Sequence, residues 1–584
     1  MSTAARTTQE SDHQAMTAAL DKDVANLVSN RDNWANTSIG ERMAVIAEIR
    51  DCLYPVINKW VDLATRNKGI PAGSPLAGEE WVSGPYALMS ACNSLLETLS
   101  KMSGKTFVDE LPIRDVGDQQ IAVRVLPHSL WDRLLLSGVS AEIWMEKGVT
   151  RDNLKANTAS GYDIPEGERK GKVSLVLGAG NIAAIPPLDC FQKLFTENQV
   201  VILKMNPVNA YLAEVLTPAL KPLTDRGALR IVSGGAEMGE YLCNHPDIDE
   251  IHITGSDITH DVIIWGPGEE GRKNKAAGTP RNKRRITSEL GAVCPTIVVP
   301  GPWSEADLSF QAEQVATQKL HNSGFNCVAC QMLLVPESWN QTDRFLDQLR
   351  TTIANAPDRP LYYPGAKDRI GQYVEQYPES TRLSPENVSA DRLVVPLREA
   401  RNAHAEKHEV FAPLLTELRL PGESAEAYLE AAIAYCNDNL HGTLGANIVI
   451  HPATRREIGE ARFQQLIASL HYGCIAINTW TGVGFLTVQG AWGAFPGHTL
   501  EDVQSGIGFV HNTYLFDRPE RTVVTAPWRP FPRNLLSGGM TLLPRPPWFV
   551  TNKRAHVVGE LLTRFVYKPG WLKLPRIFLN ALRG

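Results

Sequence analysis

The sequence predicts an α/β protein with two doubly wound α/β domains, and three observations lead to this prediction. The chain has 584 residues, of which 43% are hydrophobic and 21% charged, a composition typical of a soluble protein with large cores. Short β-rich runs alternate with helical stretches between residues 173 and 299, as in the βαβ units of a parallel sheet. A second alternating set, from residue 315 to about 450, indicates a second domain of the same class.

The first alternating set indicates where a ligand would bind. Its β-rich runs lie at residues 173–177, 200–203, 229–232, 250–253, 285–287 and 296–299, with helical stretches at 210–223 and 236–244. Ligands of open parallel sheets bind beyond the carboxyl ends of the strands. The segments to inspect are therefore 178–181, 204–207, 233–235, 254–256 and 288–291. Two of these turns carry nearby glycines, which suit a pyrophosphate, although no strict G-x-G-x-x-G is present.

Other features of the chain exclude several classes of protein. The first 16 residues lack the apolar core of a signal peptide, and the first 30 are expected to be mobile. The longest uncharged stretch, 463–500, is interrupted by polar residues and glycines, so no transmembrane helix is expected. Nine cysteines over this length do not form a disulfide framework and indicate a reducing, cytoplasmic compartment. The acidic body carries no nucleic-acid recognition motif, so no nucleic-acid partner is expected.

Cys327 is the candidate nucleophile. It lies in a segment of small and polar residues, 322–330, that suits a turn or a helix start, where the helix field lowers a thiol pKa. Glu289 ends a strand of the first domain, and a carboxylate facing a thiol across a cleft makes a base and nucleophile pair. The spacing alone leaves alternatives open. Cys327 and Cys330 could form a redox pair or half of a zinc site, and either one could be a buried structural cysteine, which is common. The chain has no second C-x-x-C and no nearby histidine pair, so the sequence does not support a metal site.

The order of the motifs resembles that of the aldehyde dehydrogenase superfamily from about residue 33 to residue 524. Gly324-Phe-Asn-Cys327 is similar to the superfamily's G-Q-x-C segment, and Glu289-Leu-Gly-Ala-Val-Cys-Pro295 is similar to its E-L-G-G-x-x-P. Glu409-Val-Phe-Ala-Pro413 is similar to its E-x-F-G-P. The resemblance implies an aldehyde dehydrogenase-like fold with a cofactor domain and a catalytic domain, a small oligomerisation element and a C-terminal extension.

The resemblance also assigns roles to single residues. It implies that Cys327 is the nucleophile, Glu289 the general base and Asn181 the amide that binds the oxyanion. The cofactor, NAD or NADP, would be bound by Lys204, Gly235, Gly239, Gly255, Ser256, Glu409 and Phe411. No metal is implied. The partners implied are an aldehyde substrate, with long-chain aldehydes among the candidates, and further copies of the chain in a homodimer or homotetramer.

The reaction that the resemblance implies is the oxidation of an aldehyde to a carboxylic acid. The Cys327 thiolate attacks the aldehyde carbon, and hydride leaves the thiohemiacetal for the nicotinamide. A water deprotonated by Glu289 then hydrolyses the thioester. Two alternatives remain. A CoA-acylating dehydrogenase or acyl reductase would exchange the acyl group with a thiol, and a catalytically silent scaffold would bind a membrane or a partner.

The chain departs from the family pattern at three places. Pro207 occupies the position at which an acidic residue usually binds the adenosine ribose, so NADP is not excluded, and Asn206-Pro207 is similar to a stretch of the CoA-acylating branch. Residues 490–495 replace the family's P-F-G-G segment, which indicates a remodelled substrate end. An insertion at 266–285 carries seven Lys/Arg and is expected to be a solvated loop at the sheet edge, away from the cofactor.

The domain boundaries follow from these assignments. We expect the cofactor domain at 31–125 and 165–288, the catalytic domain at 289–500 and the oligomerisation element at 126–164 and 501–525. The extension, 526–584, holds ten Lys/Arg, one acidic residue and eight prolines. Basic and aromatic side chains together predict either a docking arm that packs on its own or a neighbouring subunit, or a peripheral membrane contact. The aromatic residues are Trp528, Phe531, Trp548, Phe549, Phe565, Tyr567, Trp571 and Phe578.

Overall fold

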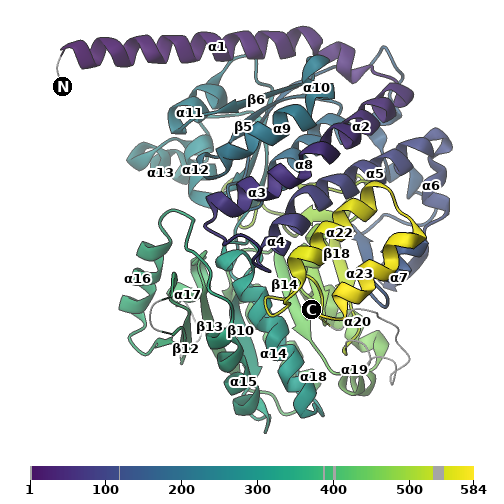
Figure 1. Ribbon diagram of the computed structural model, residues 1–584, viewed down its shortest axis with the longest axis vertical. Helices are drawn as coiled ribbons and strands as arrows, with labels where there is room; N and C mark the ends of the chain where they lie inside the picture. The colour runs from purple at the N-terminus through teal and green to yellow at the C-terminus, as the bar shows by residue number, and fades with distance from the viewer. Residues whose placement is uncertain (1–2, 118, 386–387, 399–402, 530–544) are drawn as a thin grey trace.

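A computed structural model describes residues 3–117, 119–385, 388–398, 403–529 and 545–584. It contains two large sheets with helices on their faces (Figure 1). The predicted fold class, two α/β domains built around parallel strands, is confirmed. A helical region precedes the first sheet. Its helices are α1 (Thr3–Ala35), α2 (Ile39–Leu53), α3 (Ile57–Asn67), α4 (Ala77–Trp81), α5 (Ala87–Ser100) and α6 (Thr106–Asp109).

The first sheet is parallel throughout, with the strand order β6-β5-β4-β7-β8. Its strands are β4 (Val173–Leu177), β5 (Val200–Met205), β6 (Leu229–Ser233), β7 (Glu250–Gly255) and β8 (Arg285–Leu290). The strand order reverses between β4 and β7, which is the switch point where such sheets bind ligands. The helices between these strands are α8 (Ile185–Phe191), α9 (Ala213–Ala219), α10 (Lys221–Asp225), α11 (Ala236–Asn244), α12 (Asp257–Trp265) and α13 (Gly268–Ala276).

The second sheet has eleven strands, of which the run β18-β15-β14-β9-β10-β13-β12 is parallel. Its strands, in spatial order, are β1 (Ile113–Gly117), β2 (Gln120–Leu126), β3 (Ser140–Met145), β18 (Pro519–Thr525), β15 (Cys474–Ile477), β14 (Gly445–Val449), β9 (Cys294–Val298), β10 (Cys330–Pro336), β13 (Leu414–Leu420), β12 (Leu393–Leu397) and β11 (Thr381–Arg382).

Helices pack on this second sheet, and a small hairpin lies beside it. The helices are α14 (Glu305–Leu320), α15 (Thr342–Asn355), α16 (Ala366–Gln376), α17 (His404–Lys407), α18 (Ala425–Asn439), α19 (Pro452–Ile458), α20 (Glu460–Ser469) and α21 (Thr481–Leu486). The short helix α7 (Leu130–Leu135) connects β2 to β3, and β16 (Ala491–Gly493) pairs with β17 (Phe509–His511).

Residues 3–30, for which the sequence analysis expects mobility, lie within helix α1. Helix α1 packs along the first sheet (Figure 1), with Leu20, Val24 and Leu27 buried. These residues are four and three positions apart, so they form one apolar face of the helix. Near the end of the helix, the Trp34 indole donates a hydrogen bond to the carbonyl of Leu194 at 3.1 Å.

The expected end of the first segment of the cofactor domain, at residue 125, does not coincide with the edge of a sheet. Strands β1 and β2 fall within the residues assigned to the cofactor domain, yet they pair with β3 in the eleven-stranded sheet. Their antiparallel pairing continues from β3 to β18, so a single ribbon joins the segments near residues 113–145 and 519–525. Register between distant strands is set by tertiary contacts, which a local pattern does not encode.

The described parts of the C-terminal extension, residues 526–529 and 545–584, lie against their own chain, an arrangement that the docking-arm interpretation predicts. Its helix α22 (Ala555–Tyr567) lies beside α4 and α5, and helix α23 (Leu574–Ala581) packs on α22 (Figure 1). Trp528, Phe549 and Phe565 are buried, whereas Phe531 lies outside the described residues. In the parts of the chain that the structure describes, no helix has the length and apolar character needed to cross a bilayer.

Candidate active site

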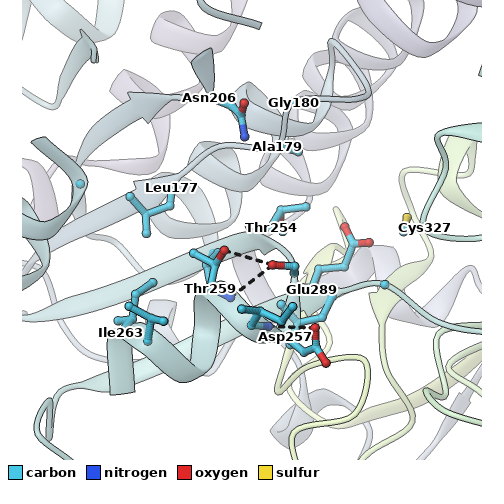
Figure 2. A pocket seen from close by; sticks show the side chains of 18 of the residues that line it. Leu177, Ala179, Gly180, Asn206, Thr254, Asp257, Thr259, Ile263, Glu289 and Cys327 are labelled. Atoms are coloured by element: carbon cyan, nitrogen blue, oxygen red, sulfur yellow. Dashed lines mark hydrogen bonds between the residues drawn. The ribbon is translucent and has the colours of Figure 1, made fainter. Parts of the chain in front are cut away.

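A cleft of about 890 Å³ opens over the carboxyl ends of the first sheet and extends to Cys327 (Figure 2). The turns that follow β4, β5, β7 and β8 all contribute to its lining. Four of the five strand-end segments expected from the sequence therefore lie together; after β6, the first lining residue is Ala236 at the start of α11. The volume falls in the range of small-molecule sites.

Cys327 lies in a tight loop between α14 and β10. Asn322, Ser323 and Gly324 take left-handed backbone angles in succession, with φ values of 52°, 57° and 79°. At Gly324 a side chain is excluded, because a Cβ would lie 2.7 Å from the carbonyl oxygen of Ala412. The carbonyl of Cys327 accepts a hydrogen bond from the Cys294 thiol at 3.3 Å. The loop is therefore fixed on both sides of the nucleophile.

Glu289 extends from the end of β8 toward Cys327 (Figure 2). The residue is 2% exposed, and neither carboxylate oxygen has a hydrogen-bond partner of ordinary geometry among the described residues. Burial raises the pKa of Glu289 to about 7, although the Cys327 thiol and the Trp492 indole act in the opposite direction. A carboxyl group that titrates near neutrality suits a general base.

The structure contradicts the expectation that the pKa of the Cys327 thiol is lowered. No helix begins at Cys327, because the loop leads into strand β10 instead. Burial raises the pKa of the thiol well above its ordinary value, and the carboxylate of Glu289 raises it further. A thiol whose pKa is raised in this way needs a base before it can act as a thiolate.

Asn181 lies between the cleft and the nucleophile loop. Its side-chain amide donates one hydrogen bond to the carbonyl of Phe325 at 3.0 Å. An amide nitrogen carries two hydrogens, so one remains for an oxyanion. Asn181 also lines the cleft that reaches Cys327, which is compatible with the role expected from the sequence.

A buried polar network that the sequence analysis missed holds this loop. The Lys68 ammonium pairs with Glu80 at 2.8 Å and donates to the carbonyl of Asn181 at 3.0 Å and to the side chain of Asn322 at 3.1 Å. The Tyr362 hydroxyl lies within hydrogen-bond distance of the same two acceptors, at 3.1 and 2.9 Å, and its single hydrogen can be donated to either. These side chains come from a helix end and a loop that carry no motif, so no local signal marks them.

The residues expected at the cofactor mostly line the cleft. Lys204, Gly239, Gly255, Ser256, Glu409 and Phe411 all do so. Gly235 does not line it, and instead caps the N-terminus of α11. Burial lowers the pKa of Lys204. The Ser256 hydroxyl accepts a hydrogen bond from the backbone N–H of Thr259 at the start of α12, whose positive end faces the cleft.

Glu409 reaches the cleft because Gly291 leaves room for it. A Cβ at Gly291 would lie 1.9 Å from a carboxylate oxygen of Glu409. Burial raises the pKa of Glu409 to about 8. Arg369 on α16, which the sequence analysis missed, donates to the carbonyls of Val410 at 2.8 Å and Phe411 at 3.1 Å and so fixes this segment.

The insertion at 266–285 is largely exposed, as expected, but it is neither a simple loop nor remote from the cleft. It contains helix α13, and its residues Pro267 and Arg281 line the cleft. The Arg284 guanidinium donates to the carbonyls of Cys243, His245 and Ile248. The expectation of remoteness was wrong because the cleft runs between α11 and α12 and reaches the end of α12, where the insertion begins.

Cys330 lies in β10 and is buried, and burial raises the pKa of its thiol to about 11. Across the part of the chain that the structure describes, no three His, Cys, Asp or Glu side chains group closely enough to hold a metal ion. The position of Cys330 in the core accords with a structural cysteine.

A second, smaller cavity of about 40 Å³ lies at Cys327 and has a largely apolar lining. Cys327 lines both this cavity and the large cleft. The candidate nucleophile therefore lies where the two spaces meet. Aromatic side chains dominate one part of the cavity wall: Trp480, Phe485, Trp492 and Trp548.

The model of the aldehyde dehydrogenase family matches residues 184–491, about half of the sequence. The chain belongs to this family. The match includes Glu289, Cys327 and Glu409 and ends before the C-terminal extension.

Curated relatives are distant. The D-glyceraldehyde dehydrogenase (NADP(+)) of Thermoplasma acidophilum is 24% identical over 292 residues, covering 46% of this chain and 55% of that protein. The malonate-semialdehyde dehydrogenase 2 of Shouchella clausii is 24% identical over 361 residues, covering 56% and 66%. The chain therefore spans about half to two thirds of the length of these relatives.

Solved structures share the fold over most of the chain. The aldehyde dehydrogenase KauB from Pseudomonas aeruginosa has a TM-score of 0.57 at 17% identity, covering 87% of this chain and 88% of that one. A Mycobacterium tuberculosis aldehyde dehydrogenase complexed with NAD+ has a TM-score of 0.57 at 20% identity, covering 87% and 90%.

Proposed function

We propose that this protein oxidises an aldehyde to a carboxylic acid with NAD or NADP, through a covalent intermediate on Cys327. The observation that carries the proposal is the position of Cys327 at the junction of a large cleft and a small apolar cavity, with the Glu289 carboxyl directed at it. A nucleophile and a base placed between two binding spaces suit a reaction that joins a cofactor to a second substrate.

The chain's own residues account for the acid–base chemistry. Glu289, which titrates near neutrality, accepts the proton of the Cys327 thiol as sulphur bonds to the aldehyde carbon. The free hydrogen of the Asn181 amide and the backbone N–H of Cys327 stabilise the oxyanion that forms. Donors of this kind are worth roughly 2.7–4 kcal/mol in the transition state. After oxidation, Glu289 deprotonates the water that cleaves the thioester, which releases the acid and restores the thiol.

The cleft fits a dinucleotide. The N-terminus of α12 with Gly255 and Ser256 suits a pyrophosphate, and Lys204 and Glu409 suit ribose hydroxyls. A nicotinamide dinucleotide bound there would supply the acceptor for the hydride that leaves the thiohemiacetal carbon. Pro207 gives this chain no carboxylate at the position that usually rejects a 2′-phosphate, so the proposal covers both NAD and NADP.

Hydrolysis is favoured over acyl transfer to CoA. The buried Glu289, with a pKa near 7, is what a hydrolytic deacylation needs. Asn206, whose neighbourhood is similar to the CoA-acylating branch, uses its side-chain oxygen locally to accept the backbone N–H of Val208 at 3.0 Å. The retention of both Cys327 and Glu289 argues against a silent scaffold. Reduced-cofactor formation with aldehydes of graded length, with and without CoA, tests these alternatives directly.

For assembly, we propose a homodimer or homotetramer formed through the antiparallel ribbon of β1, β2, β3 and β18. Among the described strands, β1 pairs with β2 alone, so the outer edge of the large sheet is open for further pairing. The molar mass in solution, measured by light scattering, tests this proposal. A mass of one chain at micromolar concentration contradicts it.

We also propose that the end of the extension contacts an anionic membrane surface. Nine large apolar side chains are exposed among the residues that the structure describes, and four of them, Trp571, Leu572, Leu579 and Leu582, lie in or beside α23. The basic residues Lys573, Arg576 and Arg583 lie among them in the sequence. Apolar side chains next to basic ones suit an interface with acidic lipids.

A further inference from the structure

The lining of the small apolar cavity at Cys327 restricts the kind of substrate side chain that the cavity can hold. Among its described lining residues none is Asp, Glu, Lys or Arg. His321 lines it, but burial lowers the pKa of His321 to about 4, so the ring is neutral at physiological pH. A charged group placed in this cavity would lose its hydration without gaining a counter-ion. The cavity therefore suits an uncharged, apolar side chain.

One wall of the cavity comes from the C-terminal extension. Trp548, from this extension, lines the cavity together with residues of the two domains. It is half-buried and lies more than 50 residues beyond Trp492, the nearest other lining residue in the sequence. The segment that carries it, residues 545–552, belongs neither to the cofactor cleft nor to the predicted catalytic domain.

Hydrogen bonds and an ion pair hold this segment against α14, the helix that leads into the loop of Cys327. The Arg545 guanidinium contacts both carboxylate oxygens of Glu313, at 2.9 and 3.3 Å, and the Thr551 hydroxyl donates to the same carboxylate at 2.6 Å. The backbone N–H of Val550 donates to Thr317 at 3.1 Å. These contacts lie on both sides of Trp548 in the sequence, so they fix its position relative to Cys327.

The extension also packs on the opposite wall. Helix α22 lies against α4 so closely that a Cβ at Gly78 would lie 2.4 Å from the backbone of Ala555, and one at Gly559 would lie 2.8 Å from Trp81. The next turn, Val82–Tyr86, supplies Val82 and Ser83 to the cavity lining. The extension thus supports two walls of the same cavity.

We propose that the C-terminal extension is part of the aldehyde site, and that Trp548 limits the length of the uncharged apolar aldehyde that this site accepts. The inference rests on the proposed function. A volume of about 40 Å³ is close to that of one or two water molecules. Only a very short apolar tail fits such a space, whereas a longer chain requires that Trp548 move or be replaced by a smaller side chain.

The test compares Trp548→Ala with the wild type over straight-chain aldehydes from propanal to decanal. The expected result is a rise of at least tenfold in kcat/KM for octanal relative to propanal, since each buried methylene is worth roughly a factor of four. Trp571→Ala is the matched control, because Trp571 belongs to the same extension but is exposed and does not line the cavity. An unchanged chain-length profile in Trp548→Ala overturns the proposal.

A second measurement separates this proposal from the proposed function. Alkylation of the Cys327 thiol by N-alkylmaleimides of increasing size needs no turnover, and Cys327→Ala corrects for the other cysteines. Trp548→Ala should accelerate the bulky reagents at least fivefold and N-methylmaleimide by much less. If the wild type oxidises no aldehyde, the proposed function fails. The labelling rates still test whether Trp548 limits the space beside Cys327. If Trp548→Ala does not fold, Trp548→Leu replaces it, and equal labelling rates for all reagents then overturn the proposal.

Discussion

The two spaces that meet at Cys327 differ in size, in lining and in origin. The large cleft, about 890 Å³, to which we assign the cofactor, is formed largely by turns that follow parallel strands and by the N-terminus of α12. The small cavity, about 40 Å³, to which we assign the aldehyde, is formed by bulky side chains from separate parts of the chain, including the extension. Backbone groups and glycines bind features common to all dinucleotides, whereas side chains select among substrates. The first space is thus set by the fold, and the second can be altered by single residues.

Replacement of the nucleophile shared by both spaces should have the largest effect. Cys327→Ala should reduce aldehyde oxidation below a thousandth of wild type, because no other thiol reaches the junction. Binding of NAD or NADP, followed by the quenching of protein fluorescence, should remain. Cys330→Ala is the control and should be mild, since Cys330 lies in the core of β10. An equally inactive Cys330→Ala enzyme would instead support a redox pair.

Glu289→Gln should affect the step after oxidation most. We expect one burst of reduced cofactor per active site and then turnover slowed by about 10² to 10⁴, because water lacks its base. Rapid-mixing absorbance at 340 nm measures both phases. Normal turnover only when CoA is present would favour the acylating alternative, and normal turnover without CoA would remove Glu289 from the mechanism.

The pKa of Glu289 predicts a pH dependence. Burial raises this pKa to about 7, and only the deprotonated carboxylate acts as a base. In a deacylation-limited enzyme kcat should therefore rise with pH up to about 7 and level off above it, with a change of about tenfold per unit on the acidic side. The pH profile of kcat checks this, and Glu289→Gln should lose the acidic limb. An acidic limb that persists in this variant belongs to another group.

On the cofactor side alone, Lys204→Ala should weaken nucleotide binding. We expect the KM for NAD or NADP to rise by roughly tenfold, the worth of one hydrogen bond from a charged donor. The KM for the aldehyde should change little, because Lys204 does not line the apolar cavity. Initial-rate measurements with each substrate varied in turn show which of the two KM values changes. A rise in the aldehyde KM alone would remove Lys204 from the cofactor site.

The smallest expected effect is at the surface of the extension, remote from both spaces. The intact protein should co-sediment with vesicles that contain phosphatidylserine, and salt should weaken this binding through screening. Replacement of Trp571 and Leu572 by serine should reduce the bound fraction severalfold without loss of activity. Ile164→Ser is the control, because Ile164 is exposed but lies outside the extension. No binding by the intact protein would remove the membrane proposal.

Much of the fold follows from local patterns. The strands at 173–177 and 200–203 and the helix at 236–244 were expected at or within a residue or two of their observed bounds, because apolar periodicity and turn residues mark them. Helix α1 shows the limit of local patterns. Its buried face, with Leu20, Val24 and Leu27, is recognised only when the helix is seen packed along the first sheet.

The sequence by itself determined the family, the candidate nucleophile and base, and some of the residues that line the large cleft, because these lie in short motifs that the family repeats. Only the tertiary structure decided the pKa directions of Cys327 and Glu289, since burial depends on what packs around a side chain. It also decided the Lys68 network and the placement of Trp548 at the apolar cavity. These contacts join residues hundreds of positions apart, and no local pattern records which distant side chains will meet.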